Sequence, residues 1–170
     1  MVGSSGSGKT TTARAISEQL GIPHIELDAL YHRPDWKPTP DDELIGAVAN
    51  AVAGEAWVVD GNYSVTRPIT WPRARTIVWL DYPRGLVMRR VVGRTLRRVV
   101  TREELWNGNR EPWTNLYRLD PERNIIRWAW TNYDGYRERY LAAREDPTWD
   151  HLDWVVHRSP AETEQWLAAL

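Results

Sequence analysis

The sequence predicts an α/β protein in which helices cover a parallel sheet. Short apolar runs rich in β-branched residues alternate with longer stretches of helical spacing, which is the pattern of βαβ units. A glycine-rich segment, GSSGSGKT at residues 3–10, fits G-x-x-x-x-G-K-[ST], which in such units joins a strand to a helix. The chain has 170 residues, 42% of them hydrophobic, and no linker-like stretch, so we expect a single domain over residues 1–170.

The elements are expected in a regular order along the chain. Strands are predicted over residues 24–28, 56–61, 76–81 and 153–157, and helices over residues 9–20, 40–53, 83–102, 121–144 and 160–170. The first helix carries Ala13, Ile16 and Leu20 on one face, and Gly21 ends it. Only two residues precede the glycine-rich segment, so we expect its leading strand to be truncated here, with native sequence upstream.

Polar residues follow each of the predicted strands. Asp28, Asp60 and Asp81 close the first three strands, and residues 157–159 follow the last one. Ligands of open parallel sheets bind at the carboxyl ends of the strands. We therefore expect these residues to lie along one edge of the sheet, next to the glycine-rich segment.

The glycine-rich segment is expected to bind nucleotide phosphates. Glycines allow conformations in which successive backbone N–H groups point at phosphate oxygens, and the following helix adds the positive end of its dipole. Lys9 would bridge the β- and γ-phosphates, and the Thr10 hydroxyl would hold Mg²⁺. The candidate nucleotide-binding residues are Gly3, Ser4, Ser5, Gly6, Ser7, Gly8, Lys9, Thr10 and Thr11. The alternative is a flexible Gly/Ser linker, but the full-length pattern and the helix after it favour a phosphate-binding loop.

Asp60 is the candidate for a second Mg²⁺ contact. It follows the apolar strand in WVVDG, where a carboxylate can orient Mg²⁺ or its bound waters, so the candidate metal residues are Thr10 and Asp60. The alternative is that Asp60 only caps the turn at Gly61.

The helix predicted over residues 83–102 is rich in arginine. Arg90, Arg94, Arg97 and Arg98 recur at spacings of three and four and therefore share a face. Such a face can clamp the oxygens of a phosphoryl group during transfer. The alternatives are a solvated basic helix face and a patch that binds nucleic acid.

The segment LDALYHRPDW is the expected acceptor region. Asp28 could orient or deprotonate an acceptor hydroxyl, and His32 and Trp36 could line the acceptor pocket. The alternatives are that Asp28 caps a turn and that His32 is structural. Trp106 and Trp113 flank a polar loop, which we expect to be a mobile lid that folds onto ligand.

Composition narrows the class of protein. The net charge is −1, which gives no strong attraction to nucleic acid or to anionic membranes. Cysteine is absent, which excludes disulfides and thiolate sites, and the four histidines lack metal-ligand spacing. No apolar run reaches the length of a membrane span, and the N-terminal residues lack the layout of a signal peptide. A cytoplasmic location is the expectation.

Several of these segments together resemble one group of proteins. GSSGSGKTT, IPHIELDALYHRPDW, WVVDGNYS, WPRA, VWLDYPR, RTLRR and ELWNGNRE occur in this order over nearly the whole chain. They are similar to the bacterial adenylate-kinase-related P-loop proteins often called topology modulation or FlaR-like proteins. The resemblance implies a three-layer α/β fold of the nucleoside monophosphate kinase type. Its parallel sheet has the order 2-3-1-4-5, with strand 1 truncated here, and an Arg-bearing lid is inserted at about residues 94–120.

The resemblance also implies roles for individual residues. Arg94 and Arg98 match lid arginines, Arg67 falls near the arginine that holds the acceptor phosphate, and Arg158 and Ser159 lie where an adenine-contacting loop is found. This chain has DGNYS in place of the D-G-F-P-R-[ST] stretch of adenylate kinases. Because the Pro-Arg pair is missing, AMP is not the expected acceptor.

The combined expectation is an ATP- and Mg²⁺-dependent kinase that phosphorylates a small molecule or a nucleotide. The candidate residues are Lys9, Asp28, Arg94 and Arg98 for catalysis, Asp28, Trp36 and Arg67 for the acceptor, and Arg94, Arg158 and Ser159 for further nucleotide contacts. The alternative is a nucleotide-dependent regulatory or nucleic-acid-associated protein without small-molecule kinase activity. We expect a monomer with no nucleic-acid or membrane partner.

Overall fold

The computed structural model describes residues 1–117, 120 and 124–170. In these residues the strands are β1 (Val2–Gly3), β2 (His24–Glu26), β3 (Val58–Asp60), β4 (Thr76–Leu80) and β5 (Asp153–His157). The helices are α1 (Lys9–Leu20), α2 (Leu27–Tyr31), α3 (Asp41–Ala51), α4 (Arg67–Thr70), α5 (Arg84–Thr101), α6 (Ile125–Glu145) and α7 (Pro160–Leu167). The strands pair in parallel, so the predicted α/β class with a parallel sheet is confirmed.

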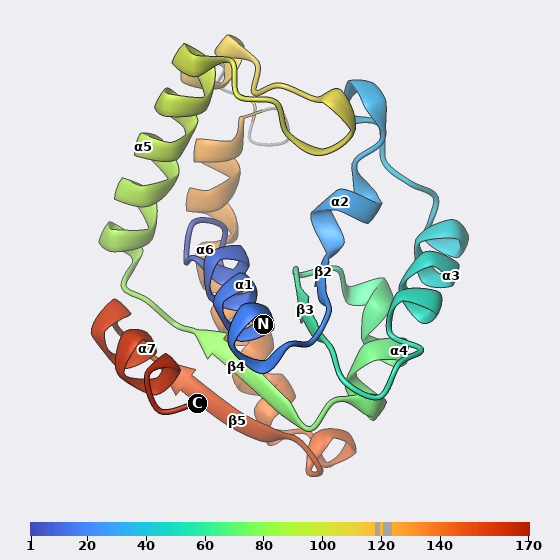
Figure 1. Ribbon diagram of the computed structural model, residues 1–170. Helices are drawn as coiled ribbons and strands as arrows, with labels where there is room; N and C mark the ends of the chain where they lie inside the picture. Colours follow the sequence, from blue (N-terminus) through green and yellow to red (C-terminus); the bar gives the residue numbers. More distant parts are fainter. Residues whose placement is uncertain (118–119, 121–123) are drawn as a thin grey trace.

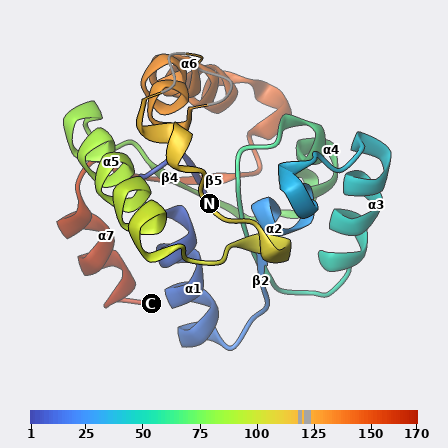
Figure 2. The ribbon, with the colours of Figure 1, turned by 90° about the horizontal axis from the view of Figure 1, so that it is seen from above.

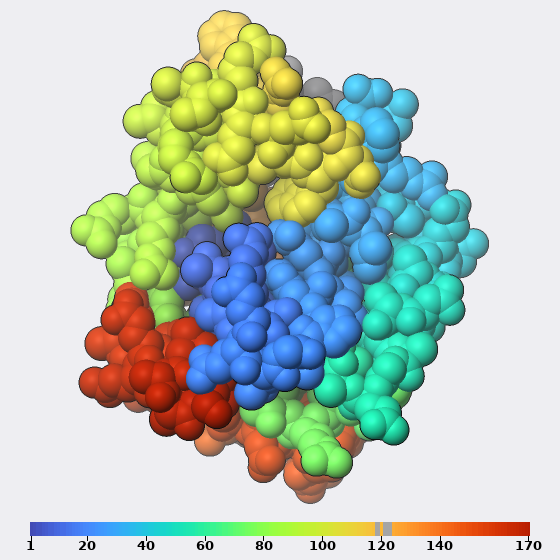
Figure 3. Space-filling model, viewed as in Figure 1, coloured from blue at the N-terminus to red at the C-terminus, as the bar shows by residue number. Residues whose placement is uncertain are grey.

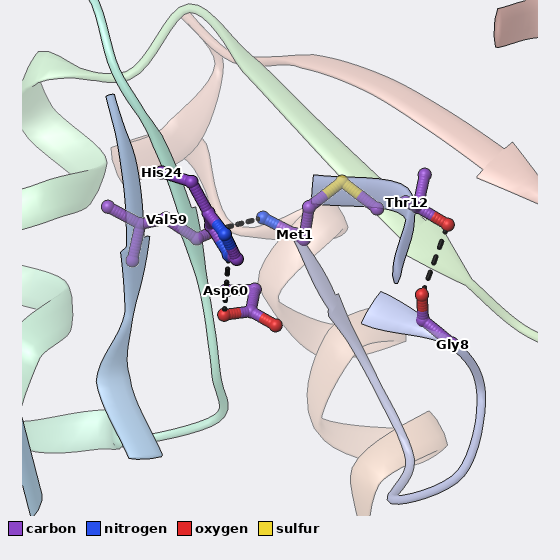
Figure 4. Close-up of polar contacts among 6 residues, drawn as sticks. All are labelled: Met1, Gly8, Thr12, His24, Val59 and Asp60. Atoms are coloured by element: carbon purple, nitrogen blue, oxygen red, sulfur yellow. Dashed lines mark hydrogen bonds and ion pairs between the residues drawn. The ribbon is translucent and has the colours of Figure 1, made fainter. Parts of the chain in front are cut away.

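The strands form two sets. β1, β4 and β5 pair in that order, and β2 pairs with β3, so the pairings do not confirm the single order 2-3-1-4-5. The two sets nevertheless meet, because the Met1 nitrogen donates a hydrogen bond of 2.6 Å to the Val59 carbonyl oxygen (Figure 4). Both residues of β1 pair with β4. The hydrogen bond of the preceding residue, Met1, connects this strand to β3.

Helices cover both faces of the β1-β4-β5 set. In Figures 1 and 2, α1 and α7 lie on one face and α6 lies on the other. Side chains alternate along β4, so its two faces join different clusters. Ile77 and Trp79 pack in a cluster with Tyr140 of α6, whereas the cluster of Val78 and Leu80 includes residues of α5, α7 and the start of α6.

The β2–β3 half has a core of its own. Ile25 and Leu27 pack against Leu44, Val48 and Val52 of the α3 region, and each of these side chains is at most 8% exposed. The amphipathic α3 therefore covers this end of the molecule, on the right of Figure 1.

Most of the predicted elements are observed within one to four residues of their expected ends. One difference affects the site, because the strand predicted over residues 24–28 ends at Glu26 and Asp28 lies in the short helix α2. Burial of Leu27 against α3 turns the chain out of the sheet at this point. α6 begins at Ile125 after the Asn124 cap, and its predicted start at residue 121 lies outside the described residues. In the described part of the chain, no helix combines the length and apolar character needed to cross a membrane.

Candidate functional site

The glycine-rich loop between β1 and α1 has a backbone that side chains would disturb. Gly3 has φ 139° and Gly6 has φ 82°, values that favour glycine. A Cβ atom on Gly3 would lie 2.7 Å from the Leu80 carbonyl oxygen, and one on Gly6 would lie 2.4 Å from Cγ2 of Val91. The loop is therefore packed tightly between β4 and α5.

Lys9 lies at the first position of α1 and folds back over the loop. Its Nζ donates hydrogen bonds to the carbonyl oxygens of Gly3 (2.9 Å) and Ser4 (3.1 Å). Burial lowers the pKa of Lys9, while the nearby Asp28 and Asp60 act in the opposite direction. An anion placed against the loop would favour the charged form of this lysine.

Asn62 supports the same loop from the other side. Its Nδ2 donates to the Gly3 carbonyl oxygen at 2.7 Å, and its Oδ1 accepts a 2.7 Å hydrogen bond from the Tyr140 hydroxyl. This amide thus connects α6 to the start of the loop.

Arginines of α5 point at the loop. Arg90 Nη1 donates to the Ser7 carbonyl oxygen at 3.0 Å, and Arg94 Nη2 lies 3.2 Å from the Ser5 hydroxyl oxygen. The Nε atoms of Arg94 and Arg98 are buried and have no hydrogen-bond partner among the described residues. Burial lowers the pKa of Arg94, and the neighbouring Arg98 lowers it further. The Arg98 guanidinium is paired with Glu103, so Arg94 is the cation with a buried donor left for phosphate oxygens.

Asp60 lies at the carboxyl end of β3 and is 2% exposed. Its Oδ1 is 3.2 Å from Nε2 of His24, as Figure 4 shows beside the Met1–Val59 contact. Thr12 Oγ1 donates to the Gly8 carbonyl oxygen at 3.1 Å and holds the first turn of α1 (Figure 4). No group of three or more metal-ligating side chains occurs among the described residues, so a metal ion here would rely on phosphate oxygens for part of its coordination.

Asp28 is held by a tyrosine. The Tyr63 hydroxyl donates a 2.7 Å hydrogen bond to Asp28 Oδ1. Burial raises the pKa of Tyr63, and the Asp28 charge raises it further, so the hydroxyl remains a donor. This contact holds one oxygen of Asp28, the carboxylate predicted from the sequence to act on the acceptor.

The loop, α5, β3 and α2 contribute residues to one cleft of about 720 Å³. The candidates that line it are Ser5, Gly6, Ser7, Gly8, Lys9, Thr10, Thr11, Asp28, Asp60, Arg94 and Arg98. Glu26, which no motif singled out, lines it as well. Burial raises the pKa of Glu26, the Trp106 hydrogen bond opposes this shift, and the charges of Asp60 and Asp28 add to it.

The loop after α5, residues 102–112, packs on residues 27–36, the segment predicted from the sequence to bind the acceptor. Asn107 Nδ2 donates to the carbonyl oxygens of Ala29 and His32, at 3.2 and 2.6 Å. Asn109 donates to the Arg33 carbonyl oxygen at 2.9 Å and accepts from the Trp36 backbone N–H at 2.9 Å. Figure 3 shows this loop, in yellow, lying against the blue segment that follows β2.

Aromatic rings complete the contact of this loop with the acceptor region. Trp106 stacks on His32 with a centroid distance of 5.5 Å, and Trp36 packs edge-on against both rings. Trp113 is 67% exposed and contacts Tyr117. Part of the lid expected at residues 94–120 lies outside the described residues, namely 118 and 119.

Other candidates lie away from the cleft lining. The Arg67 guanidinium lies over the rings of Trp71 (4.7 Å) and Tyr140 (5.5 Å). Trp36 contacts the loop after α5 rather than the lining. Ser159 caps α7 and exchanges hydrogen bonds with Glu162, and the Arg158 backbone N–H also donates to Glu162. The next residue along, Pro160, does line the cleft.

Sequence reasoning missed several residues of the site. Glu26 has a weak signal, since it stands near the end of the strand predicted over residues 24–28, at the edge of the sheet where ligands bind. The side-chain amides of Asn62 and Asn109 have no signal of this kind, because their partners are up to 78 positions away.

Among known proteins, the chain is distantly similar to kinases. No family model matches the chain. The chain is similar to shikimate kinases of Synechococcus elongatus and of a second Synechococcus strain, each 26% identical over 132 residues, which is 65% of this chain and 70% of the relative. The chain resembles P-loop kinases. This likeness supports that general family at most, and neither the FlaR-like group nor an adenylate-kinase-like activity follows from it.

Proposed function

We propose that this protein is a kinase that transfers the γ-phosphoryl group of ATP to a hydroxyl group of a small molecule. The observation that carries the proposal is the convergence of Lys9, Arg94 and Asp28 on one cleft beside the glycine-rich loop. The first two supply positive charge for phosphates, and the third supplies a carboxylate for the acceptor. Phosphoryl transfer needs mainly placement and charge stabilisation from the protein, which this set of residues can provide.

The loop fits a triphosphate on two counts. Gly3 and Gly6 have conformations and close contacts that exclude side chains, and a glycine-rich backbone of this kind can turn successive N–H groups toward an anion. The buried Nε atom of Arg94 has hydrogen-bonding capacity that the described residues do not satisfy. Residues 3–11 would hold the phosphates, and Lys9 would exchange its bonds to Gly3 and Ser4 for bonds to phosphate oxygens.

Thr10 and Asp60 are the residues that would hold Mg²⁺, together with phosphate oxygens. Both line the cleft, and a hydroxyl plus a carboxylate is a donor set that suits this hard cation. Bound there, Mg²⁺ would neutralise charge on the phosphates.

The acceptor step follows from the position of Asp28. Tyr63 occupies Oδ1, which leaves Oδ2 to accept a hydrogen bond from the acceptor hydroxyl. As the new bond from the acceptor oxygen to the γ-phosphorus forms, the bond from that phosphorus to the β,γ-bridging oxygen breaks. Asp28 takes the hydroxyl proton and passes it to solvent, and ADP leaves. Arg94 and Arg98 stabilise the charge on the transferring group.

A regulatory or nucleic-acid-associated role is the alternative, and it would use the arginines of α5 on a polyanion. Arg90 and Arg94 direct their guanidinium groups at the glycine-rich loop of the same chain, which supports the kinase proposal instead. A polyanion-binding protein would lose affinity steeply with salt, with no dependence on Lys9.

The test is acceptor-dependent ADP release by purified protein with ATP and Mg²⁺. The acceptors are small alcohols, sugars, nucleosides, nucleoside monophosphates and shikimate, the compound named in the distant relatives. The Lys9→Ala variant should weaken ATP binding by about 100-fold or more, because charge-assisted contacts to the phosphates are lost. Lys37→Ala is the matched control, since Lys37 is exposed and paired with Asp35.

A second pair of variants separates turnover from binding. Arg94→Ala should reduce kcat by about 10²- to 10³-fold with a smaller change in ATP affinity, because its charge acts mainly in the transition state. Arg89→Ala on the exposed side of the same helix should leave kcat unchanged. Retention of ATP binding by Lys9→Ala, or release of ADP that no acceptor raises, would overturn the proposal.

A further inference from the structure

Arg90 of α5 is bound to the backbone of the glycine-rich loop. Its Nη1 donates a hydrogen bond of 3.0 Å to the Ser7 carbonyl oxygen, and its guanidinium lies over the Tyr82 ring, 5.4 Å from the centroid. Arg94, one turn further along the helix, contacts the Ser5 hydroxyl and keeps a buried Nε without a partner among the described residues. The two arginines both line the cleft, but Arg90 is already engaged by the protein.

The hydrogen bond from Arg90 orients one peptide unit of the loop. In the described part of the chain every peptide bond is trans, and in a trans peptide the C=O and N–H groups point in opposite directions. Because Arg90 holds the Ser7 carbonyl oxygen on the side of α5, the Gly8 N–H is turned to the other side. A Cβ atom on Gly8 would lie 3.4 Å from Arg90 Nη1, so the arginine also packs against this peptide.

The Gly8 N–H is free to bind a ligand. Among the described residues it has no hydrogen-bond acceptor, and Gly8 lines the cleft. An N–H group that is turned to a cleft and has no partner is suited to a phosphate oxygen.

Arg90 can keep its contact when a nucleotide binds. Lys9 donates to the carbonyl oxygens of Gly3 and Ser4, and it gives up these bonds if it moves to a phosphate. The Ser7 carbonyl oxygen depends on Arg90, which the proposed function does not require to move.

Tyr82 gives the guanidinium of Arg90 a rigid support. This tyrosine is 2% exposed. Its hydroxyl is hydrogen-bonded to the Thr163 hydroxyl of α7, and its carbonyl oxygen accepts a 2.6 Å hydrogen bond from the Tyr133 hydroxyl of α6. A cation over a ring that is held in this way is restricted in position.

We propose that Arg90 is a positioning residue of the phosphate-binding loop: supported by the ring of Tyr82, it holds the Ser7 carbonyl oxygen and so keeps the Gly8 N–H directed at the phosphates. This inference rests on the proposed kinase function. The sequence groups Arg90 with Arg94 and Arg98 as a clamp on the transferring group. In the structure their contacts differ, since Arg90 acts through the backbone and Arg94 has a donor left for the ligand.

The first test compares ADP with a non-hydrolysable ATP analogue by calorimetry, using Arg90→Met. Loop amides contact phosphates that both nucleotides possess, so both affinities should fall by the same factor, about tenfold. A clamp on the γ-phosphoryl group would weaken the ATP analogue more than ADP. Arg89→Met, an exposed change on the same helix, is the control. An unchanged affinity for ADP, or a loss confined to the ATP analogue, would overturn the inference.

The second test follows the Gly8 amide by NMR. ADP should shift this resonance in the parent, and Arg90→Met at saturating ADP should show a shift reduced by about half or more, because the N–H is no longer aimed at the phosphates. Thermal melts establish that the variant is folded at the temperature of the measurement. A Gly8 shift equal to that of the parent would show that Arg90 does not orient this peptide.

The third test keeps the charge of Arg90 and removes its support. Tyr82→Leu should weaken ADP binding severalfold, and Tyr82→Phe, which keeps the ring, should bind ADP more tightly than Tyr82→Leu. The double variant with Arg90→Met and Tyr82→Leu should bind ADP no more weakly than Arg90→Met alone, because both changes release the same hydrogen bond. Parental affinity in Tyr82→Leu, or additive losses in the double variant, would contradict the proposed pairing.

The outcomes separate the two proposals. If ATP binds in a Lys9-dependent way and Arg90→Met binds like the parent, the kinase function stands and the role of Arg90 is wrong. If Lys9→Ala retains ATP binding, the kinase function itself is overturned, and the role of Arg90 falls with it.

Discussion

Asn62 Nδ2 lies 2.7 Å from the carbonyl oxygen of Gly3, 59 positions earlier in the chain. The same carbonyl oxygen accepts a hydrogen bond from Lys9, so the amide and the lysine converge on one backbone atom. If Lys9 moves to a bound phosphate, as the proposed function requires, Asn62 is left as the group that holds this carbonyl. The position of the loop therefore depends on a residue outside the sequence motif.

Substitution of Asn62 should weaken both the fold and nucleotide binding. Asn62→Ala leaves the buried Tyr140 hydroxyl without its acceptor and should lower the free energy of unfolding by about 1–3 kcal/mol. Asn62→Asp keeps an acceptor for Tyr140 but turns a carboxylate oxygen toward the Gly3 carbonyl. ATP affinity, measured by calorimetry, should therefore fall more for Asn62→Asp than for Asn62→Ala.

The exposed Asn50, near the end of α3, provides the control, and Asn50→Ala should match the parent in both measurements. Wild-type ATP affinity in Asn62→Asp would mean that Asn62 serves only as a partner for Tyr140.

Gly6→Ala should abolish tight ATP binding. The new Cβ would lie 2.4 Å from Val91 Cγ2, at a φ of 82° that alanine rarely adopts, so the loop must shift away from α5. Fluorescence titration with an ATP analogue should show at least about a tenfold loss of affinity. Gly46→Ala in α3 is the matched control, since nothing lies within 4 Å of its Cβ, and it should stabilise the protein by up to about 1 kcal/mol. Equal ATP affinity in the two variants would contradict the packing described for the loop.

Asn109 should control how tightly the loop after α5 docks on the acceptor region. Asn109→Ala removes the hydrogen bond that the Trp36 N–H donates and the bond that Asn109 donates to Arg33. Hydrogen exchange at the Trp36 amide should accelerate by about tenfold or more, because each lost bond contributes about 1 kcal/mol. Asn132→Ala in α6 should leave this exchange rate unchanged. Protection of Trp36 that persists in Asn109→Ala would show that the stacked rings and the Asn107 hydrogen bonds are enough to hold the loop.

The free energy of unfolding of the ligand-free protein should depend on pH because of Glu26. The pKa of Glu26 in the folded protein is raised above its usual value of 4.5, so the folded state holds this proton to a higher pH than the unfolded state does. The contribution of Glu26 to stability therefore falls as pH rises from 4.5 through the folded pKa. Glu26→Gln cannot ionise and should have a higher Tm than the parent at pH 7, with a gap that closes near pH 4. Thermal melts between pH 4 and pH 7 measure this difference in Tm. A difference that stays constant with pH would contradict the prediction.

Local pattern predicted the elements that the site depends on. α1 and β5 have the predicted bounds Lys9–Leu20 and Asp153–His157, because clear stop signals such as Gly21 flank strongly periodic segments. The end of β2 was predicted two residues too late, because burial of Leu27 against α3 is a tertiary effect that local pattern does not contain. Arg67 resembles an acceptor-phosphate residue by position, and its guanidinium lies over Trp71 and Tyr140 with Nη2 buried and without a hydrogen-bond partner among the described residues, so that role stays a prediction.

The sequence by itself determined the glycine-rich loop and the prediction that it binds phosphate, since residues 3–10 have glycines, a lysine and a hydroxyl at the spacings of that motif. It also determined the alternation of strands and helices, because side-chain periodicity reports which face is buried. Only the tertiary structure decided that Asn62 supports Gly3, that Asn109 fastens the loop after α5, and that Glu26 stands beside Asp28 in the cleft. These contacts join segments up to 76 positions apart. They depend on how layers pack against one another, which no spacing along the chain records.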